Sequence, residues 1–225
     1  MPKRKDDLEP HAPSTPEVED DLRPLDDVPS DLHGAEVRET LLASVDLAER
    51  EATALEIVES RLHEVAFTSA VLRGASVRDV EIDGGDWSTA DATDARFVRV
   101  RFRGVRLTGL MLVRATLEDV VFEECRIDFA SLRSAKLSRV SFEDCRMAEM
   151  DFLGAELSSV TFGECDLSRA TLIDVRFERT LMRGCELDGV VDAGRLRGVA
   201  MPWPDVIRSA AVLADAVGIH IVVDD

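Results

Sequence analysis

The sequence predicts a solenoid, a chain that coils around one axis with a structural unit of five residues. Every fifth residue from Leu62 to Leu187 is apolar, and all nine phenylalanines except Phe129 fall in that register. The positions two residues earlier hold mostly small or slim side chains. At these small positions the same kind of residue also recurs every twenty residues, as one valine series and one cysteine-containing series show: Val80, Val100, Val120, Val140 and Val160; Val105, Cys125, Cys145, Cys165 and Cys185. Self-similarity at a fixed period is the signature of a repeat architecture.

The units ASLRS, AKLSR, AELSS, CDLSR and ATLID resemble the pentapeptide-repeat family, whose unit is A(D/N)Lxx with Leu or Phe at its centre. The resemblance covers residues 61–189 firmly and 41–60 less firmly. It implies an all-β, right-handed quadrilateral parallel β-helix, in which each pentapeptide forms one side and twenty residues form one coil. The second period of twenty agrees with four sides. We expect about 7 coils with a rise of about 4.8 Å each, followed by a short C-terminal helix and strand.

Residues 1–35 are acidic and rich in proline, and they hold few large apolar side chains. Such a segment cannot bury enough surface to offset its ordering entropy, so a disordered tail is predicted. Residues 36–60 are predicted to form either an N-terminal cap or a weak first coil. Leu42, Leu47 and Ile57 fit the register, but Arg50 would point a charge into the core. The stretch DLAEREATALEIVES could instead form a capping helix. Residues 61–190 are predicted to form the β-helix itself.

Residues 191–225 follow the end of the register. Pro204 can open a helix, apolar residues recur after it at helical spacing, and Gly218 can stop it. The stretch IHIVV predicts a short strand. This segment is expected to cover the last coil, and the alternative is a homodimer contact. The resemblance to gyrase-protecting members, whose C-terminal end carries the dimer contact, supports the alternative. The candidate residues are Trp203, Val206, Ile207, Leu213, Ile219 and Ile221.

The only cysteines, Cys125, Cys145, Cys165 and Cys185, lie twenty residues apart. On a four-sided coil they would form one inward-facing column with a rise of about 4.8 Å. Tetrahedral zinc needs four sulfurs that converge on one point, and parallel Cβ atoms at that rise exceed the usual disulfide spacing. The spacing therefore favours a column of small, buried apolar side chains that continues Val105.

No catalytic constellation is apparent, so we predict neither an enzyme nor a cofactor. His11, His33, His63 and His220 have no partner at ligand or triad spacing, and the chain shows no Gly-rich phosphate loop. The formal net charge of −18 disfavours direct binding to nucleic acid. No stretch reaches the roughly 18 apolar residues of a membrane span. Because no apolar run follows the basic N-terminus, a cytoplasmic location is expected.

Two functions are therefore considered. The first is a rigid, non-enzymatic scaffold that binds a protein partner. The second comes from the resemblance to fluoroquinolone-resistance members in repeat, size and acidity, which implies a DNA mimic that binds a type II topoisomerase, DNA gyrase, and protects it. Many outward columns mix charges and resemble solvated cross-coil ion pairs, each contributing about 0–1 kcal/mol. One ridge stays acidic and is the candidate partner-binding surface: Glu118, Asp119, Glu123, Glu124, Glu143, Asp144 and Glu164.

Overall fold

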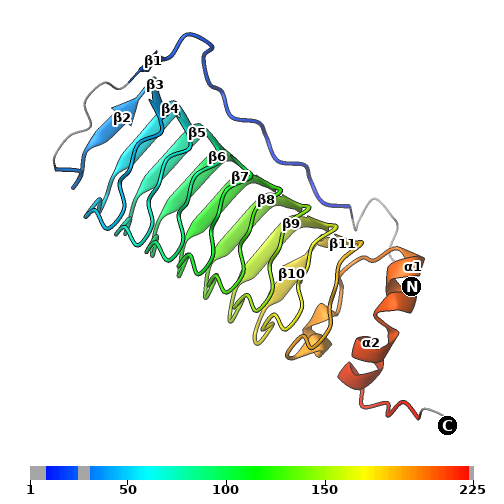
Figure 1. Ribbon diagram of the computed structural model, residues 1–225. Helices are drawn as coiled ribbons and strands as arrows, with labels where there is room; N and C mark the ends of the chain where they lie inside the picture. The colour runs from blue at the N-terminus through cyan, green and yellow to red at the C-terminus, as the bar shows by residue number, and fades with distance from the viewer. Residues whose placement is uncertain (1–8, 25–30, 223–225) are drawn as a thin grey trace.

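The computed structural model describes residues 9–24 and 31–222 (Figure 1). It confirms the all-β class and the right-handed quadrilateral parallel β-helix, with about 8 turns where about 7 were expected. Six strands of eight residues dominate the stack, each paired in parallel with the next. They are β4 (Glu56–His63), β5 (Ser76–Asp83), β6 (Arg96–Arg103), β7 (Thr116–Glu123), β8 (Lys136–Glu143) and β9 (Glu156–Gly163).

The chain turns a corner once in every pentapeptide. Every fifth residue from Gly34 to Gly189 has a positive φ, including Glu124 at 54° and Phe129 at 61°. This left-handed conformation costs an L-residue about 1–2 kcal/mol, so a sequence without compensating interactions would not repeat it. The compensation comes from the ladders between coils and from the core that they enclose. In β4 to β9 the corner falls inside the strand, which therefore bends near its middle.

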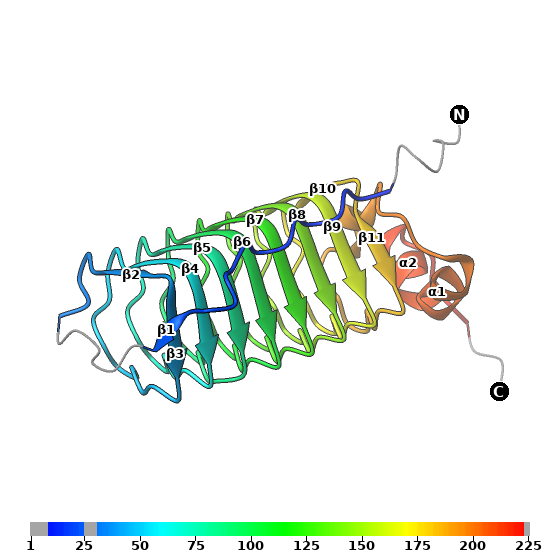
Figure 2. The same cartoon turned by 90° about the horizontal axis from the view of Figure 1, so that it is seen from above.

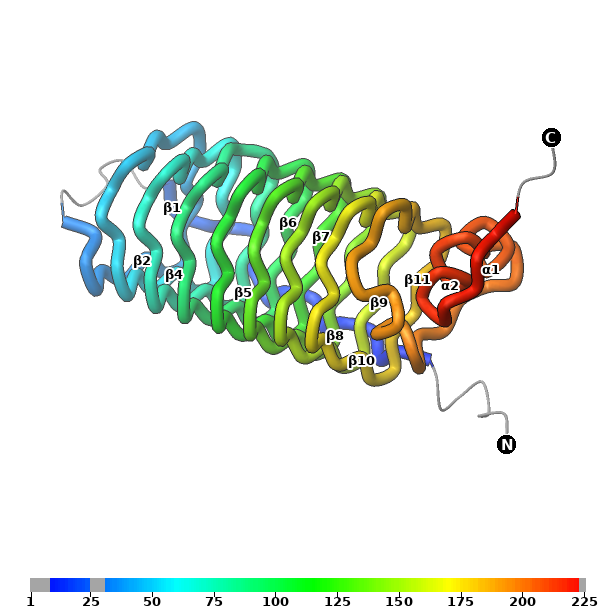
Figure 3. Tube along the Cα trace, turned by 90° about the horizontal axis from the view of Figure 1, so that it is seen from below, coloured from blue at the N-terminus to red at the C-terminus, as the bar shows by residue number. Residues whose placement is uncertain are grey.

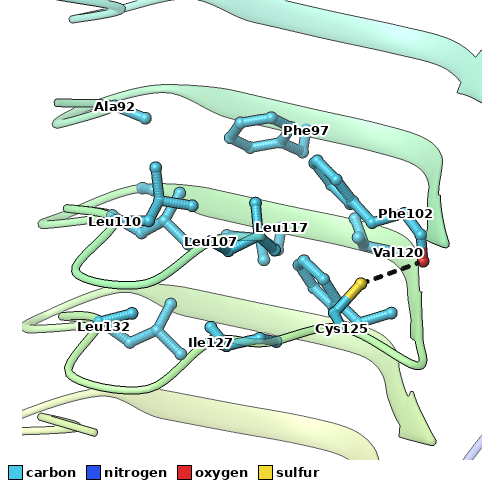
Figure 4. Close-up of a cluster of buried hydrophobic side chains, with 14 of the residues drawn as sticks. Ala92, Phe97, Phe102, Leu107, Leu110, Leu117, Val120, Cys125, Ile127 and Leu132 are labelled. Atoms are coloured by element: carbon cyan, nitrogen blue, oxygen red, sulfur yellow. Dashed lines mark hydrogen bonds between the residues drawn. The ribbon is translucent and has the colours of Figure 1, made fainter. Parts of the chain in front are cut away.

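The interior is filled by side chains that stack by kind from coil to coil. Phe102, Phe122, Phe142 and Phe162 form one file, with ring centroids 4.8, 4.8 and 5.1 Å apart and planes within 6° of parallel. Figure 4 shows Phe102 beside Phe97 and Leu117 in this interior. Phe122 lies directly opposite Phe142 in the strand register. Side chains twenty residues apart therefore lie above one another, as the period predicts.

The four cysteines stand in one buried file and are free thiols. Each donates a weak hydrogen bond to a phenylalanine carbonyl of the coil before it. Cys125 Sγ lies 3.6 Å from Phe102 O (Figure 4), and Cys145 Sγ lies 3.5 Å from Phe122 O. Burial raises the pKa of Cys185 to about 11, so this thiol is protonated at neutral pH. The file continues Val105 as a column of small packed side chains, as predicted.

Residues 36–60 form coils and not a capping helix. The strands β2 (Glu36–Arg38) and β3 (Thr40–Ala43) both pair in parallel with β4, and the register of large buried residues already begins at Leu32. Ala52 occupies a fully buried large position, and its N–H donates to Val71 O at 2.8 Å. Arg50, at a small position, is half-buried. The ladder with the next coil supplies the backbone partners that a helix would otherwise have to provide.

Part of the N-terminal segment predicted to be a disordered tail lies within the described residues. Residues 9–24 follow the outside of the solenoid (Figures 1 and 2), and β1 (Arg23–Pro24) pairs in parallel with β3. The contacts of this segment are with the surface of the coils, a source of ordering that its own composition does not include. Residues 31–35 enter the first coil, and residues 1–8 and 25–30 of the predicted tail lie outside the described residues.

The C-terminal end carries helices beyond the last coils. The short strands β10 (Arg176–Glu178) and β11 (Leu181–Arg183) both pair with β9, and a 3-10 helix at Ala193–Leu196 follows. The predicted single helix is divided at Ser209 into α1 (Trp203–Arg208) and α2 (Ala210–Ala216). Gly218, with φ 77°, follows as the helical path ends. No helix in the described ranges is long and apolar enough to cross a membrane.

The predicted strand at IHIVV is wrong for residues 219–222, which are exposed and have no strand pairing in the described structure. A strand needs a neighbouring edge for its backbone groups. Figure 3 shows this segment at the helical end of the molecule, beside α2, and its Ile219 N–H donates to Ala214 O of that helix at 2.9 Å. Val223, the last residue of that stretch, lies outside the described residues.

Candidate interaction surfaces

The seven residues of the predicted acidic ridge occupy two different corners. Glu118 and Asp119 lie at the bend in the middle of β7, where Arg139 of the next coil contacts both. Its Nη2 lies 2.8 Å from Glu118 Oε1 and its Nε 2.7 Å from Asp119 Oδ1. The Asp119 side chain is only 8% exposed. These two carboxylates are therefore neutralised within the fold and do not extend a free acidic ridge, because the twenty-residue period places Arg139 directly beside them.

The other five carboxylates remain together at the next corner: Glu123, Glu124, Glu143, Asp144 and Glu164. We call these five the acidic corner. Glu123 faces Glu143 in the strand register, while Glu124, Asp144 and Glu164 occupy exposed left-handed corner positions of three successive coils. The coil rise of about 4.8 Å stacks like charges closely, which is unfavourable.

The acidic corner has little internal compensation. Glu123 has Arg101 at 4.0 Å, whereas no ion pair to Glu124, Glu143, Asp144 or Glu164 exists within the ranges that the structure describes. Burial, followed by the charge of neighbouring Asp144, raises the pKa of Glu143 above its ordinary value. The corner therefore holds electrostatic repulsion that a bound cationic group would relieve.

A groove adjoins the acidic corner. Gly84 and Gly104 occupy the same corner in the two preceding coils, and with Glu64 and Glu124 at its ends they border a groove of about 550 Å³. A Cβ atom added at Gly104 would meet no atom within 4 Å, which shows how open this corner is. Arg106 and Arg126 also line the groove. A side chain from a partner could enter here beside the carboxylates.

The C-terminal candidates divide between an inner and an outer side. Val206 and Leu213 are half-buried, and Leu213 packs against the core. Trp203 is 73% exposed, and Ile207, Ile219 and Ile221 are each 58% exposed. The helices thus cover the last coil with one side and present apolar side chains to solvent with the other.

Asp205, which the sequence analysis did not single out, attaches α1 to the solenoid. Its Oδ2 accepts a hydrogen bond of 3.0 Å from Gly184 N–H, and its Oδ1 one of 3.1 Å from Arg208. The Asp205 side chain is 9% exposed. Carboxylates are common in the first turn of a helix, so the sequence did not distinguish Asp205 from other such residues. Its contact with Gly184 became visible only in the structure.

The N-terminal segment forms a second surface feature that the sequence analysis missed. Ser14 N–H donates to Asp119 Oδ1 at 2.9 Å, and Glu17 N–H donates to Asp79 Oδ1 at 3.2 Å. Hydrogen bonds from Arg139 and then from Ser14 outweigh burial and hold the pKa of Asp119 below its ordinary value. The available sequence signal was a proline at every third position, Pro10, Pro13 and Pro16. Residues 9–18 are called the N-terminal strap below.

The described residues hold no group of three or more His, Cys, Asp or Glu side chains that could bind a metal ion. What they present instead is a rod with carboxylates along one corner, a strap along another and an apolar surface at one end.

These features define a class of protein, the four-sided parallel β-solenoids. Residues 95–172 match the sequence model described as "Pentapeptide repeat region", and residues 70–109 match the one described as "Pentapeptide repeats (8 copies)". The chain therefore belongs to the pentapeptide-repeat proteins. A comparison with curated proteins found no match.

Several solved structures of pentapeptide-repeat proteins are similar to this chain. HetL, involved in heterocyst differentiation regulation in the cyanobacterium Nostoc, is 18% identical with a TM-score of 0.37, over 77% of this chain and 92% of HetL. Full-length QnrB1, a plasmid-mediated fluoroquinolone resistance protein, is 19% identical with a TM-score of 0.33, over 82% of this chain and 99% of QnrB1. Rfr23 from the cyanobacterium Cyanothece is 13% identical with a TM-score of 0.17, over 70% of this chain and 88% of Rfr23.

Proposed function

We propose that this protein is a non-enzymatic interaction module whose acidic corner binds a basic surface on a protein partner. The stacking of Glu124, Asp144 and Glu164 on successive coils carries this proposal, because close like charges are an electrostatic cost that a bound basic group would relieve. Several other corner charges pair across coils, as Arg114 does with Asp94 at 2.6 Å and Arg169 with Glu149 at 2.8 Å.

The rigidity of the coils supports the same function. Parallel ladders on both sides hold the carboxylates of β7 and β8 at a fixed spacing. A preorganised surface loses little conformational entropy when a partner binds, so more of the interaction energy appears as affinity. The residues that line these surfaces are carboxylates, arginines and small side chains, which suit recognition better than catalysis, and no cofactor is proposed.

A second, more specific proposal is that the partner is a DNA-binding protein, a type II topoisomerase such as DNA gyrase. A rod with carboxylates at a regular spacing presents the kind of charge pattern that a basic DNA-binding surface attracts. The protein would then act as a DNA mimic and protect the enzyme from quinolones, without contacting nucleic acid itself. The stacked acidic corner is the observation that favours this partner class.

The test is a triple charge reversal, Glu124→Lys, Asp144→Lys and Glu164→Lys. We expect at least about a tenfold loss of affinity for a fluorescent oligolysine peptide, equivalent to about 1.4 kcal/mol, because attraction at the corner becomes repulsion. The matched control is Glu49→Lys, Glu56→Lys and Glu186→Lys, which changes the net charge equally at exposed positions elsewhere. Equal losses in both triple variants would show that net charge alone attracts the peptide and would contradict the proposed surface.

The same proteins in a gyrase supercoiling assay address the second proposal. The wild-type chain and the control triple variant are expected to change supercoiling or quinolone sensitivity, and the corner triple variant is not. Unchanged supercoiling and sensitivity with the wild-type protein would remove gyrase as the partner while leaving the peptide result as a separate test of the acidic corner.

We also propose a homodimer through the outer side of the C-terminal helices, where Trp203 and Ile207 are one helical turn apart and exposed. Burying such a side chain contributes about 1.5–3 kcal/mol, so the variant Trp203→Ser, Ile207→Ser should raise the dimer dissociation constant at least about 100-fold. Sedimentation equilibrium of the full chain measures this, with Phe129→Ser as a control that removes an equally exposed apolar group elsewhere. We expect the dimer dissociation constant to lie below about 100 μM. A wild-type chain that still sediments as a monomer at that concentration would overturn the dimer.

A further inference from the structure

The bend in the middle of β5, β6, β7 and β8 carries charges that alternate from coil to coil. Asp79, Arg99, Asp119 and Arg139 occupy this position in four successive coils, and we call them the charged bend. Arg99 binds Asp79 through both Nε and Nη2 at 2.6 Å. Arg139 binds Asp119 in the same manner at 2.7 and 2.8 Å. Because the signs alternate, a carboxylate acceptor recurs at every second coil.

The N-terminal strap meets those carboxylates with backbone donors. Ser14 N–H binds Asp119 and Glu17 N–H binds Asp79, so three residues along the strap span two coils of the solenoid. The Asp79 and Asp119 side chains are 5% and 8% exposed. At the other end of the strap, His11 Nε2 lies 2.9 Å from Arg179, which occupies the same bend three coils beyond Asp119. The strap thus runs antiparallel to the order of the coils, as Figure 2 shows.

The prolines of the strap mark its contact side. Pro10, Pro13 and Pro16 are half-buried, whereas His11, Ala12, Ser14 and Thr15 between them are exposed. Each donor residue directly follows a proline. A proline at every third position favours a polyproline II helix, which repeats every three residues and keeps one edge against a surface.

The two periods match between Ser14 and Glu17, whereas the side-chain contact of His11 with Arg179 reaches one coil further. Three residues of polyproline II advance about 9.3 Å, and two coils at about 4.8 Å advance about 9.6 Å. A polyproline II segment therefore presents a backbone N–H to a carboxylate of the charged bend once per turn without stretching. The fixed φ of proline also lowers the entropy lost when the segment is ordered.

We propose that the charged bend is a binding site for an extended polypeptide with a proline at every third residue, and that residues 9–18 of the same chain are its resident ligand. The acceptors Asp79 and Asp119 recognise the N–H that follows a proline. Arg99 and Arg139 hold these carboxylates in place and leave one lone pair of each directed at the strap. A second segment of the same chemistry binds only by displacing the strap.

The first test uses a fluorescent peptide with the sequence of residues 9–20, titrated into full-length protein and followed by anisotropy. In the variant Pro10→Gly, Pro13→Gly, Pro16→Gly the resident strap is weakened, and we expect the peptide to bind at least tenfold more tightly than to the wild-type chain. Adding Asp79→Asn and Asp119→Asn to that variant should weaken binding at least tenfold. A peptide with glycine at its three proline positions should bind at least tenfold more weakly than the proline peptide.

Equal binding of the proline and glycine peptides, or unchanged binding after the two Asp→Asn substitutions, would overturn the proposed site. The wild-type chain supplies an independent test by amide hydrogen exchange. Ser14 and Glu17 should exchange at least tenfold more slowly than Thr15, relative to their unstructured rates, at all protein concentrations. Exchange of Ser14 as fast as that of Thr15 would overturn the site, and protection that grows with concentration would show that a second copy supplies the ligand.

Discussion

Replacing Phe142 with alanine is expected to destabilise the folded chain by about 3–5 kcal/mol, the range for removing a buried phenylalanine from a core. Phe142 is 1% exposed and stacks between Phe122 at 4.8 Å and Phe162 at 5.1 Å. In a solenoid each coil contacts only its neighbours, so no distant element can move into the cavity. Denaturant unfolding followed by far-UV circular dichroism measures the loss.

Phe129→Ala provides a matched control, because it removes the same side chain from the one phenylalanine outside the register. Phe129 is 59% exposed at a left-handed corner. Its replacement should change the free energy of unfolding by no more than about 0.5 kcal/mol, as at other surface positions. A Phe142→Ala variant as stable as Phe129→Ala would mean that the aromatic file contributes little to the fold.

Gly85→Ala is expected to destabilise the chain by about 3 kcal/mol, through overpacking and a left-handed backbone together. Gly85 has φ 92°, and a Cβ atom there would overlap the carbonyl oxygen of Val65 in the preceding coil. Backbone, unlike the end of a flexible side chain, cannot move aside without disturbing the ladder. In the other coils this small position holds a valine or a cysteine, none of them with a positive φ, so glycine is needed here only because the backbone departs locally from the repeat.

Gly104→Ala tests whether the effect comes from the contact and not from losing a glycine. Gly104 has φ 63°, and an added Cβ would meet nothing within 4 Å. Glu124 and Asp144 already adopt the same left-handed conformation at this corner with φ 54°. We expect a cost of about 1 kcal/mol, the price of one left-handed L-residue. Thermal unfolding of the two variants in parallel compares them, and equal shifts would refute the backbone clash at Gly85.

The period of five and the period of twenty were sufficient to predict the coils because every coil repeats the same local rule. Phe122 over Phe142 and Cys125 over Cys145 follow directly from spacing once the chain turns a corner in each unit. The weak register at residues 36–60 was harder to interpret, since Ala52 and Arg50 depart from the pattern. They are tolerated there because the backbone of both residues still forms hydrogen bonds with Val71 in the next coil.

The surfaces were less predictable than the core. The ridge of seven carboxylates was inferred from proximity in sequence, but residues 118–119 and 123–124 lie on different corners, and Arg139 neutralises the first pair. The strand expected at IHIVV was inferred from the β-propensity of its residues. Such residues do not form a strand unless a neighbouring strand offers a free edge for pairing. The Pro-rich tail was judged by its own composition, whereas its hydrogen bonds are to carboxylates far away in sequence.

The sequence by itself determined the solenoid, the side chains that enter its core and the file of buried thiols. The reason is that these depend on contacts between units that repeat at constant separation. Only the tertiary structure decided where the strap lies, which carboxylates stay unpaired at the acidic corner and how Asp205 attaches the C-terminal helices. Each of these depends on a single contact between segments unrelated by the repeat, and a periodic pattern holds no information about such contacts.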